Sequence, residues 1–292
     1  MLQGQSEHSA LNTCKKSTAP VKVCWNLTSR CNLNCRFCFG PKGFTEELGT
    51  GQVKAVAQKL RAAGVQRIVL SGGEPILRKD LPEIIEFATT IGLKVSLATN
   101  GFALKESFIR KCGKHLKLVE VSLAGCNEQT ELKMRGKKGL FKKVIKTLEL
   151  LKQNGVQIKI NTMVSKKNKI CLEEIGAIAE KFGARCWKIF QFVPRNKGKK
   201  SRQEFEISDK EFTRIKQKIS KKFPTLNIAW APKKYFSRAY FNVYPNGNVS
   251  VPRISSEKNI GNILEQTVEE LWKNPLFDEE KHFSETSVPF DS

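Results

Sequence analysis

Three cysteines lie close together near the amino end of the chain, in the stretch TSRCNLNCRFCFG. Cys31, Cys35 and Cys38 have a C-x3-C-x2-C spacing. A structural zinc ion normally takes four protein ligands, often as two C-x-x-C pairs, and the second pair is missing here. A [4Fe–4S] cluster is also held by thiolates, and three cysteines leave one of its irons without a protein ligand. The spacing therefore favours an iron–sulfur cluster with an open, catalytic iron over zinc or over cysteines with no ligand role.

A second stretch, SGGEP (71–75), follows an apolar run and suggests chemistry of another kind. Its glycines, Gly72 and Gly73, allow the backbone to approach a ligand closely, and the Glu74 carboxylate can pair with an ammonium group. Taken alone, a Gly-Gly pair after a strand usually marks a turn. Its meaning therefore depends on where the fold places it relative to the three cysteines.

Strand-like apolar runs alternate with helical patterns along most of the chain. The six runs are residues 21–27, 67–71, 94–99, 116–123, 156–164 and 186–193. This alternation predicts an α/β fold of parallel strands joined by right-handed crossovers, and six units make a partial (β/α)6 TIM-like barrel rather than a closed barrel of eight. Ligands bind at the carboxyl ends of such strands, where the cysteines and SGGEP both fall.

Three regions are predicted along the chain. Residues 1–19 form a flexible amino-terminal segment, residues 20–222 form the barrel, and residues 223–292 form a small carboxyl-terminal extension that covers it. The clearest element of the extension is YFNVYPNGNVSV (240–251), two alternating runs around an Asn-Gly pair, which predicts a β-hairpin.

Composition sets limits on partners and location. The 292 residues include 51 Lys and Arg against 28 Asp and Glu, a formal net charge of +23, which favours anionic partners such as nucleotides, phosphates or nucleic acid. A solvated lysine-rich surface explains the charge equally well, because no base-reading motif is present. The sequence shows neither a signal-peptide core nor an apolar run near the roughly 18 residues of a membrane helix, so we expect a cytoplasmic protein without a membrane partner.

Nine cysteines, an odd number, argue against a secreted disulfide framework. Six of them show no ligand spacing and are expected to be ordinary or buried thiols: Cys14, Cys24, Cys112, Cys126, Cys171 and Cys186. Among these, Cys24 is the exception, because it could lie near a substrate.

Together, the cysteine spacing and the SGGEP stretch resemble the radical S-adenosylmethionine (SAM) superfamily of enzymes. Cys31, Cys35 and Cys38 match its three cluster ligands, and SGGEP follows the second strand as the SAM-binding motif of that superfamily does. The resemblance implies these SAM-binding residues: Phe37, Gly72, Gly73, Glu74, Asn100, Ser122 and Arg135. It also implies one [4Fe–4S] cluster and SAM as cofactors.

The resemblance further implies a reaction. SAM chelates the open iron, and an electron supplied by a reductase, a flavodoxin or a ferredoxin cleaves its sulfonium bond, giving a 5′-deoxyadenosyl radical that removes a hydrogen atom from the substrate. No cysteine follows Cys186, so auxiliary clusters are not expected. The tail resembles that of SPASM/twitch-type relatives without such clusters.

The fifth and sixth strands carry candidate substrate-binding residues. Lys159 and Asn161 lie on the opposite strand face from Ile158 and Ile160, so they are predicted to line the barrel. A buried, unpaired lysine is costly, which makes an anionic ligand a natural partner. Lys188 is a second such cation. The alternative is that these lysines are exposed strand residues.

Several stretches resemble viperin and its prokaryotic relatives, the SAM-dependent nucleotide dehydratases. They are WNLTSRCNLNCRFCF, SGGEP, KIN, WKIFQ, FEISDKEF and FDEE. The resemblance implies that Lys159, Asn161 and Lys188 hold a nucleoside triphosphate. It also implies that the radical attacks the ribose 4′ carbon and that the 3′ hydroxyl leaves as water. The product would be a 3′-deoxy-3′,4′-didehydro nucleotide used in antiviral defence.

Two other functions remain open at this point. Cys24 and Asn26 stand where viperin relatives have asparagine and histidine, and YPNG with GNILEQTVEELW is similar to the tails of peptide- and cofactor-modifying enzymes. The chain could therefore be a single-cluster radical SAM enzyme that modifies a peptide, an RNA or a cofactor precursor. The second alternative is a non-catalytic metal protein that binds nucleic acid through its lysines.

Overall fold

The computed structural model describes residues 19–41, 43–254 and 256–286. Its strands are β1 (Lys22–Thr28), β2 (Arg67–Gly72), β3 (Lys94–Thr99), β4 (Leu116–Ser122), β5 (Ile158–Val164), β6 (Cys186–Gln191), β7 (Ile228–Ala231), β8 (Phe241–Val243), β9 (Asn248–Pro252) and β10 (Glu257–Asn262). Its α-helices are α1 (Thr50–Ala62), α2 (Leu81–Thr90), α3 (Glu106–Cys112), α4 (Glu128–Arg135), α5 (Leu140–Gln153), α6 (Leu172–Lys181), α7 (Lys197–Lys200), α8 (Arg202–Phe205), α9 (Asp209–Lys222), α10 (Val268–Trp272) and α11 (Glu279–Thr286). The predicted flexible segment 1–19 lies outside the described residues except for Ala19.

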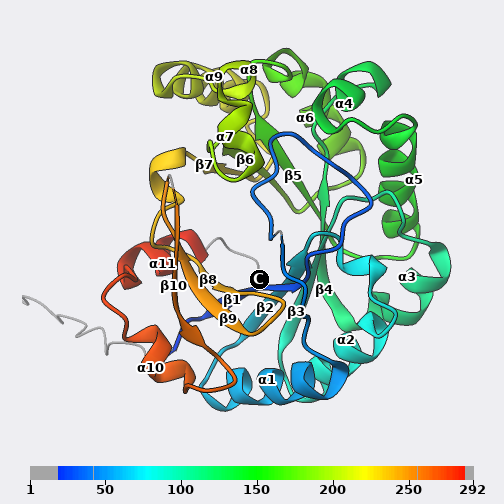
Figure 1. The fold of residues 1–292 in the computed structure, drawn as a ribbon. Helices are drawn as coiled ribbons and strands as arrows, with labels where there is room; N and C mark the ends of the chain where they lie inside the picture. The colour runs from blue at the N-terminus through cyan, green and yellow to red at the C-terminus, as the bar shows by residue number, and fades with distance from the viewer. Residues whose placement is uncertain (1–18, 42, 255, 287–292) are drawn as a thin grey trace, which may run out of the picture.

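All ten strands form one curved sheet in the order β10-β9-β8-β1-β2-β3-β4-β5-β6-β7. Strands β1 to β6 are parallel and adjacent in sequence order, and helices line the outer side of the sheet (Figure 1). The predicted partial α/β barrel of six parallel units is thereby confirmed. Their carboxyl ends meet at one rim, which brings together the loops that follow β1, β2, β3 and β4.

The extension adds strands to both edges of this sheet, which the sequence did not indicate. Strand β7 pairs in parallel with β6 at one edge, and β8 pairs in parallel with β1 at the other. The expected hairpin is present as β8–β9, with Gly247 at φ 85° in its turn, and β10 pairs antiparallel with β9. The boundaries proposed for the barrel and its extension stay a prediction.

Strand alternation separates an apolar outer face from a polar inner one. On β1, Val23, Trp25 and Leu27 are at most 1% exposed and pack in the main core, while Lys22 and Cys24 take the alternate positions and face the barrel interior. The predicted helical spacing holds as well, because the apolar positions of α1 are buried in the same core. The core therefore lies between sheet and helices and leaves the interior for polar side chains.

The open side of the barrel, between the two sheet edges, is bridged by side chains. Glu257 at the start of β10 accepts hydrogen bonds from Arg195 Nη2 at 2.9 Å, Ser250 Oγ at 2.8 Å and Asn242 Nδ2 at 3.2 Å. It also accepts one from the Tyr244 hydroxyl. Arg195 follows β6 and the other three donors belong to the extension, so this Glu257 cluster ties the extension to the far wall of the barrel.

One expectation about the cysteines is wrong. Cys126 and Cys171, expected to be thiols, form a disulfide with their Cα atoms 5.3 Å apart. They are 45 residues apart in sequence, so spacing gave no indication of the pairing; the fold brings the loop after β4 against the start of α6. Cys24, Cys112 and Cys186 are free thiols as expected, and Cys14 lies outside the described residues. Within the described ranges, no helix is long and apolar enough to span a membrane.

Candidate active site

The three cysteines lie in the loop that leaves the carboxyl end of β1. Cys31 is exposed, and Cys35 and Cys38 are half-buried. Backbone amides point at two of the sulfurs: Leu33 N lies 3.4 Å from Cys31 Sγ and Gly40 N lies 3.3 Å from Cys38 Sγ. Such amides stabilise sulfur that carries negative charge. Burial raises the pKa of the Cys31 and Cys35 thiols, so a bound metal would have to supply the charge that ionises them.

The donor set fits an iron–sulfur cluster better than a single ion. It consists of three thiols on one loop, with backbone amides near the sulfurs of Cys31 and Cys38. In the described part of the chain, no three His, Cys, Asp or Glu side chains converge closely enough to hold one metal ion. Three thiols without a fourth protein ligand suit a cluster with one open iron better than a structural zinc ion.

The two glycines of SGGEP hold the cysteine loop to the sheet. Gly73 N donates to Thr28 O at 2.7 Å and Glu74 N donates to Arg30 O at 2.8 Å. A Cβ atom on Gly73 would lie 2.2 Å from Arg30 O, and one on Gly72 would lie 2.4 Å from Thr28 O. The sequence suggested that these glycines let the backbone approach a ligand closely. In the structure, the backbone they approach closely is that of the cysteine loop. Contact of these glycines with SAM stays a prediction.

The Glu74 carboxylate is buried at the rim beside the end of β3. It accepts hydrogen bonds from Thr99 Oγ1 at 2.8 Å and from the backbone amides of Asn100 at 2.7 Å and Ile76 at 3.3 Å. Burial raises its pKa despite these donors. An ammonium group placed beside it would favour the charged form again. Asn100 in turn donates through Nδ2 to Asn32 Oδ1 at 2.7 Å, so Glu74 also positions the cysteine loop.

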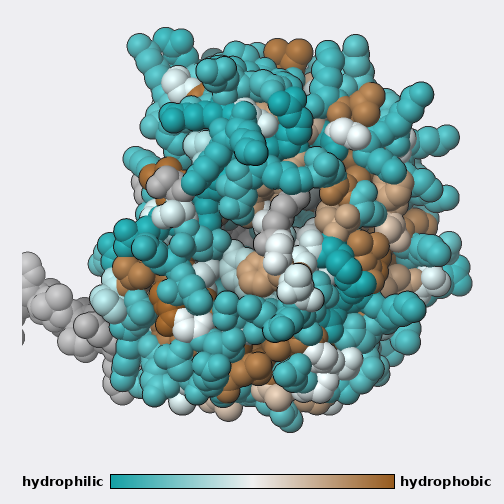
Figure 2. Space-filling model, viewed as in Figure 1, coloured by the Kyte–Doolittle hydropathy of each residue, from teal (hydrophilic) through white to brown (hydrophobic). Residues whose placement is uncertain are grey.

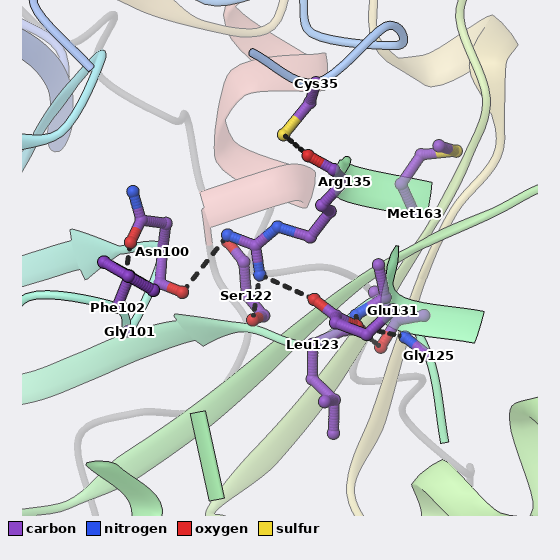
Figure 3. A network of polar contacts seen from close by, with 12 residues as sticks. Cys35, Asn100, Gly101, Phe102, Ser122, Leu123, Gly125, Glu131, Arg135 and Met163 are labelled. Atoms are coloured by element: carbon purple, nitrogen blue, oxygen red, sulfur yellow. Dashed lines mark hydrogen bonds and ion pairs between the residues drawn. The ribbon is translucent and has the colours of Figure 1, made fainter. Parts of the chain in front are cut away.

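Arg135, at the end of α4, links three rim loops through main-chain atoms (Figure 3). Its guanidinium donates to Ser122 O at 2.9 Å and to Asn100 O at 3.1 Å, and its own carbonyl lies 3.8 Å from Cys35 Sγ. It is only 4% exposed. In this structure Arg135 therefore holds the ends of β3 and β4 against the cysteine loop, and a direct contact with SAM stays a prediction.

Glu131 is a rim residue that the sequence analysis missed. It is fully buried, pairs with Arg135 at 2.9 Å, and accepts the backbone amides of Ala124 at 3.0 Å and Gly125 at 2.5 Å. The Glu-to-Arg spacing of four residues on a helix was an available signal for this pair. The Asn127 side chain caps α4 by accepting from Thr130 N at 2.9 Å, which fixes where the helix begins and hence where both charges lie.

Inside the barrel, Lys159 has a partner that the sequence did not indicate. Lys159 is 3% exposed, and its Nζ lies 3.0 Å from Glu120 Oε2 on the adjacent strand. Burial opposes ionisation of Glu120, but Lys159 and Lys22 outweigh it and lower the pKa of that carboxyl to about 2. The expectation of a lysine without a protein partner is therefore wrong. The alternative of an exposed lysine is also wrong, because the strand does turn this residue inward.

Asn161 is the next inward-facing residue of β5 after Lys159, so it lies closer to the rim, and Lys188 is its neighbour on β6. The strand register aligns both with Ser122, the residue whose carbonyl Arg135 contacts. Lys188 is 8% exposed, lies 3.1 Å from the Tyr240 hydroxyl, and sits over the Phe190 ring at 5.3 Å. This level of the interior therefore lies directly below the rim network.

The Asn161 amide is only half satisfied by the described residues. Its Nδ2 donates to Glu120 Oε2 at 2.9 Å, whereas its Oδ1 is buried and has no hydrogen-bond partner among them. A buried acceptor without a donor is costly, so a ligand N–H or O–H at this point would remove a penalty.

Lys22 and Cys24 extend the polar interior along β1. Burial, reinforced by the nearby Lys159, lowers the pKa of Lys22 to about 8, and burial raises the pKa of the Cys24 thiol. Neither Lys22 nor Glu120 was selected from sequence. A charged residue at an inward position of an apolar strand was the available signal in both cases.

A sequence profile of the Radical SAM superfamily matches residues 25–179. The chain belongs to the radical SAM superfamily. The matched stretch begins within β1 and ends within α6, so it contains the cysteine loop, SGGEP, Arg135 and Lys159. Superfamily membership implies a [4Fe–4S] cluster and SAM, and three cysteines in the loop after β1 are the donors present for such a cluster.

Curated radical SAM proteins similar to the chain have different activities. An AdoMet-dependent heme synthase of Methanosarcina barkeri is 34% identical over 206 residues, covering 68% of this chain and 57% of the relative. An S-adenosylmethionine-dependent nucleotide dehydratase of Lacinutrix mariniflava is 31% identical over 217 residues, covering 68% and 44%. The mycofactocin maturase of Mycolicibacterium smegmatis is 32% identical, covering 62% and 46%. The chain thus spans about half the length of these relatives.

Solved radical SAM structures have the same fold. Streptococcus suis SuiB bound to its precursor peptide SuiA superposes with a TM-score of 0.73 at 16% identity, over 91% of this chain and 67% of SuiB. An anSMEcpe structure with bound AdoMet gives 0.71 at 18% identity, over 94% and 84%. At these identities the likeness is one of fold.

Proposed function

We propose that this radical SAM enzyme acts on an anionic small molecule held inside the barrel, with a nucleoside triphosphate as the first candidate. When bound, the cluster and SAM supply a 5′-deoxyadenosyl radical that takes a hydrogen atom from the substrate. The observation that carries the proposal is the cationic interior, where Lys22 and Lys159 lie beside the Glu120 carboxylate and Lys188 lies one level nearer the rim.

In this proposal, residues at the rim bind the cluster and SAM, and residues in the interior bind the substrate. Cys31, Cys35 and Cys38 hold the cluster as thiolates. The SAM-binding side chains and backbone atoms are those of Phe37, Gly72, Gly73, Glu74, Asn100, Ser122 and Arg135. Because Arg135 and Glu74 are engaged by protein partners, we assign them to shaping the SAM pocket, with Glu74 facing the SAM ammonium group.

Buried lysines inside the barrel suit an anionic substrate such as a triphosphate. Lys188 and Asn161 provide the cation and the buried acceptor at the level below the rim, and Asn161 Oδ1 suits a ribose hydroxyl or a base amino group. The 31% identical nucleotide dehydratase and the KIN and WKIFQ stretches add support. The reaction would be hydrogen-atom removal at the 4′ carbon, followed by departure of the 3′ hydroxyl as hydroxide. A second electron from the reductant would complete the 3′,4′ double bond, and one proton would convert the hydroxide to water.

The test is 5′-deoxyadenosine formation by anaerobically reconstituted protein with SAM and dithionite. CTP, UTP, GTP and ATP are added singly, and products are identified by mass spectrometry. Strong stimulation by one triphosphate, with a product lighter by one water, is the expected result. Slow cleavage that no triphosphate changes would overturn the nucleotide assignment and leave the radical SAM chemistry intact.

A second candidate is a carboxylate-bearing cofactor precursor. The 34% identical heme synthase and a 36% identical Fe-coproporphyrin III synthase favour it, and lysines bind carboxylates as they bind phosphates. Stimulation of the same assay by iron-coproporphyrin III, but not by triphosphates, would select it. A peptide substrate would be indicated if neither class stimulates and a precursor peptide does.

A further inference from the structure

Four aromatic side chains border one pocket on the open side of the barrel. They are Phe39 in the cysteine loop, Phe190 on β6, and Phe236 and Tyr240 on the segment between β7 and β8. Gln191, Val193 and Ala231 complete the lining. We call this site the aromatic pocket. It lies where the cysteine loop, the sixth strand and the extension meet.

The four rings contact one another but stay outside the hydrophobic core. The centre of the Phe236 ring lies 5.2 Å from that of Phe39 and 5.7 Å from that of Tyr240. All four rings are half-buried, and within the described ranges none of them belongs to the clusters that form the core. Figure 2 shows hydrophilic residues over most of the face that it draws. Partly exposed aromatic surface gathered at one point is typical of a ligand site.

Two buried cations lie against these rings. Lys188 Nζ is 5.3 Å from the centre of the Phe190 ring and 5.5 Å from that of Tyr240. The Arg195 guanidinium lies 5.2 Å from the centre of the Phe236 ring. Lys188 is 8% exposed and Arg195 is 3% exposed. The aromatic pocket therefore combines flat apolar surface with positive charge, which suits a ligand that carries both a conjugated ring and an anionic group.

The aromatic pocket adjoins both parts of the candidate active site. On one side, Phe39 directly follows Cys38. On the other side, Lys188 is in register with Asn161 on β5, whose buried Oδ1 has no hydrogen-bond partner among the described residues. A ligand whose ring occupies the aromatic pocket can therefore place its polar part at Asn161 and Lys188 while it remains beside the cysteine loop.

We propose that the aromatic pocket binds the flat conjugated ring of the substrate, with Phe236 stacked on that ring. The inference rests on the proposed function and deepens it, because a nucleoside triphosphate carries such a ring as its base and iron-coproporphyrin III carries one as its tetrapyrrole. In this structure the Phe39 and Phe236 rings meet at 72°, so the ligand ring enters as one of them turns aside. Side-chain rearrangements of this kind are common on binding.

The test measures binding without turnover. Cluster-loaded protein with SAM, and without a reductant, is titrated with CTP, UTP, GTP and ATP singly, with inorganic tripolyphosphate, and with iron-coproporphyrin III. Tripolyphosphate carries the anionic chain of a nucleotide without its ring, so the comparison isolates the contribution of the ring.

Three variants separate the ring from the fold. Phe236→Ala removes one wall of the aromatic pocket, and Phe236→Tyr keeps a flat ring in the same place. Phe87→Ala is the matched control, because Phe87 is also half-buried and has a cation over its ring, with Lys54 Nζ 5.3 Å from the centre, but lies on α2 on the outer side of the barrel.

We expect Phe236→Ala to raise the dissociation constant of the preferred nucleoside triphosphate about tenfold and to leave that of tripolyphosphate unchanged. Phe236→Tyr and Phe87→Ala should leave both constants unchanged. Unchanged nucleotide affinity in Phe236→Ala would overturn the inference. An equal loss of affinity for nucleotide and tripolyphosphate would also overturn it, since the ring would then act only through the fold or the neighbouring charges.

The remaining outcomes separate this inference from the proposed function. If no triphosphate binds but iron-coproporphyrin III does, and Phe236→Ala weakens its binding, the ring is a tetrapyrrole and the second candidate function is selected. If iron-coproporphyrin III binds equally well with and without Phe236, the aromatic pocket is not its site and the inference is wrong. If the unaltered protein binds neither class of ligand, the proposed function itself is contradicted.

Discussion

The rim of the barrel and its interior are held by different kinds of contacts. At the rim, the partners are mostly main-chain atoms: Gly73 N binds Thr28 O at 2.7 Å, and Arg135 Nη2 binds Asn100 O at 3.1 Å. In the interior, Glu120 holds its neighbours through side chains alone. Backbone contacts at the rim leave little room for larger side chains, so few substitutions are tolerated there. Side-chain contacts in the interior can be changed one residue at a time. This difference suits a rim that cleaves SAM in the same way throughout the superfamily. The interior below it can then bind a substrate particular to this chain.

The largest effect is expected at the rim from Cys35→Ser. Loss of one thiolate should prevent stable cluster assembly, so iron content, the visible absorbance of the cluster and 5′-deoxyadenosine formation should all fall to background. Cys112→Ser, at a buried thiol on α3, is the control and should keep its iron. Full cluster loading in the Cys35 variant would show that Cys35 is not a ligand.

Gly73→Ala tests whether the rim depends on backbone contact. The added Cβ would lie 2.2 Å from Arg30 O, and moving a backbone is costly, about 3 kcal/mol. We expect a lower melting temperature and severalfold less iron per chain. Gly51→Ala on α1, whose Cβ would meet nothing within 4 Å, is the matched control. Normal iron loading by the Gly73 variant would mean that the rim is more adaptable than its contacts indicate.

Glu120→Gln tests the side-chain network of the interior. A pKa of about 2 in place of 4.5 corresponds to about 3 kcal/mol of stability. Because the folded-state pKa is the lower one, this stability is present above pH 4.5 and is lost as pH falls towards 2. The variant should be less stable at pH 7, and its stability should fall less between pH 4.5 and 2, as measured by urea unfolding. Glu149→Gln, on exposed α5 surface, should leave both quantities unchanged.

The smallest effect is expected from Lys188→Met, which removes an interior cation while keeping most of its volume. If a nucleoside triphosphate is the substrate, its KM should rise about tenfold, or about 1.4 kcal/mol. Iron content should not change, since Lys188 lies on β6 and contacts Tyr240 and Phe190. Lys142→Met on the exposed face of α5 is the control. A fall in iron content with unchanged KM would reverse the roles assigned to interior and rim.

Local patterns predicted the fold better than they predicted its contacts. The six parallel strands follow from apolar runs of strand length, and the inward direction of Lys159 follows from simple alternation. Glu120 could not be recognised as its partner, because it lies 39 residues earlier and only the strand register joins the two. The pairing of Cys126 with Cys171 was hidden for the same reason.

The two sheet edges show the same limitation. Strand β8 was recognisable as part of a hairpin, but its pairing with β1 depends on segments more than 200 residues apart. The cysteine spacing and SGGEP, in contrast, were sufficient to predict the superfamily, because cluster and SAM binding require short, contiguous stretches. What remained hidden was the backbone role of the glycines and of Arg135, since that depends on which loops the fold brings into contact at the rim.

The Glu257 cluster has a consequence for how the barrel could be opened. Walls made by paired strands separate only when a ladder of backbone hydrogen bonds breaks. On its remaining side this barrel is held by side chains, and two of the contacts across are the Arg195–Glu257 ion pair and the Lys188–Tyr240 hydrogen bond. Such contacts can break without disturbing any strand pairing, so this flank could open while the sheet itself stays intact.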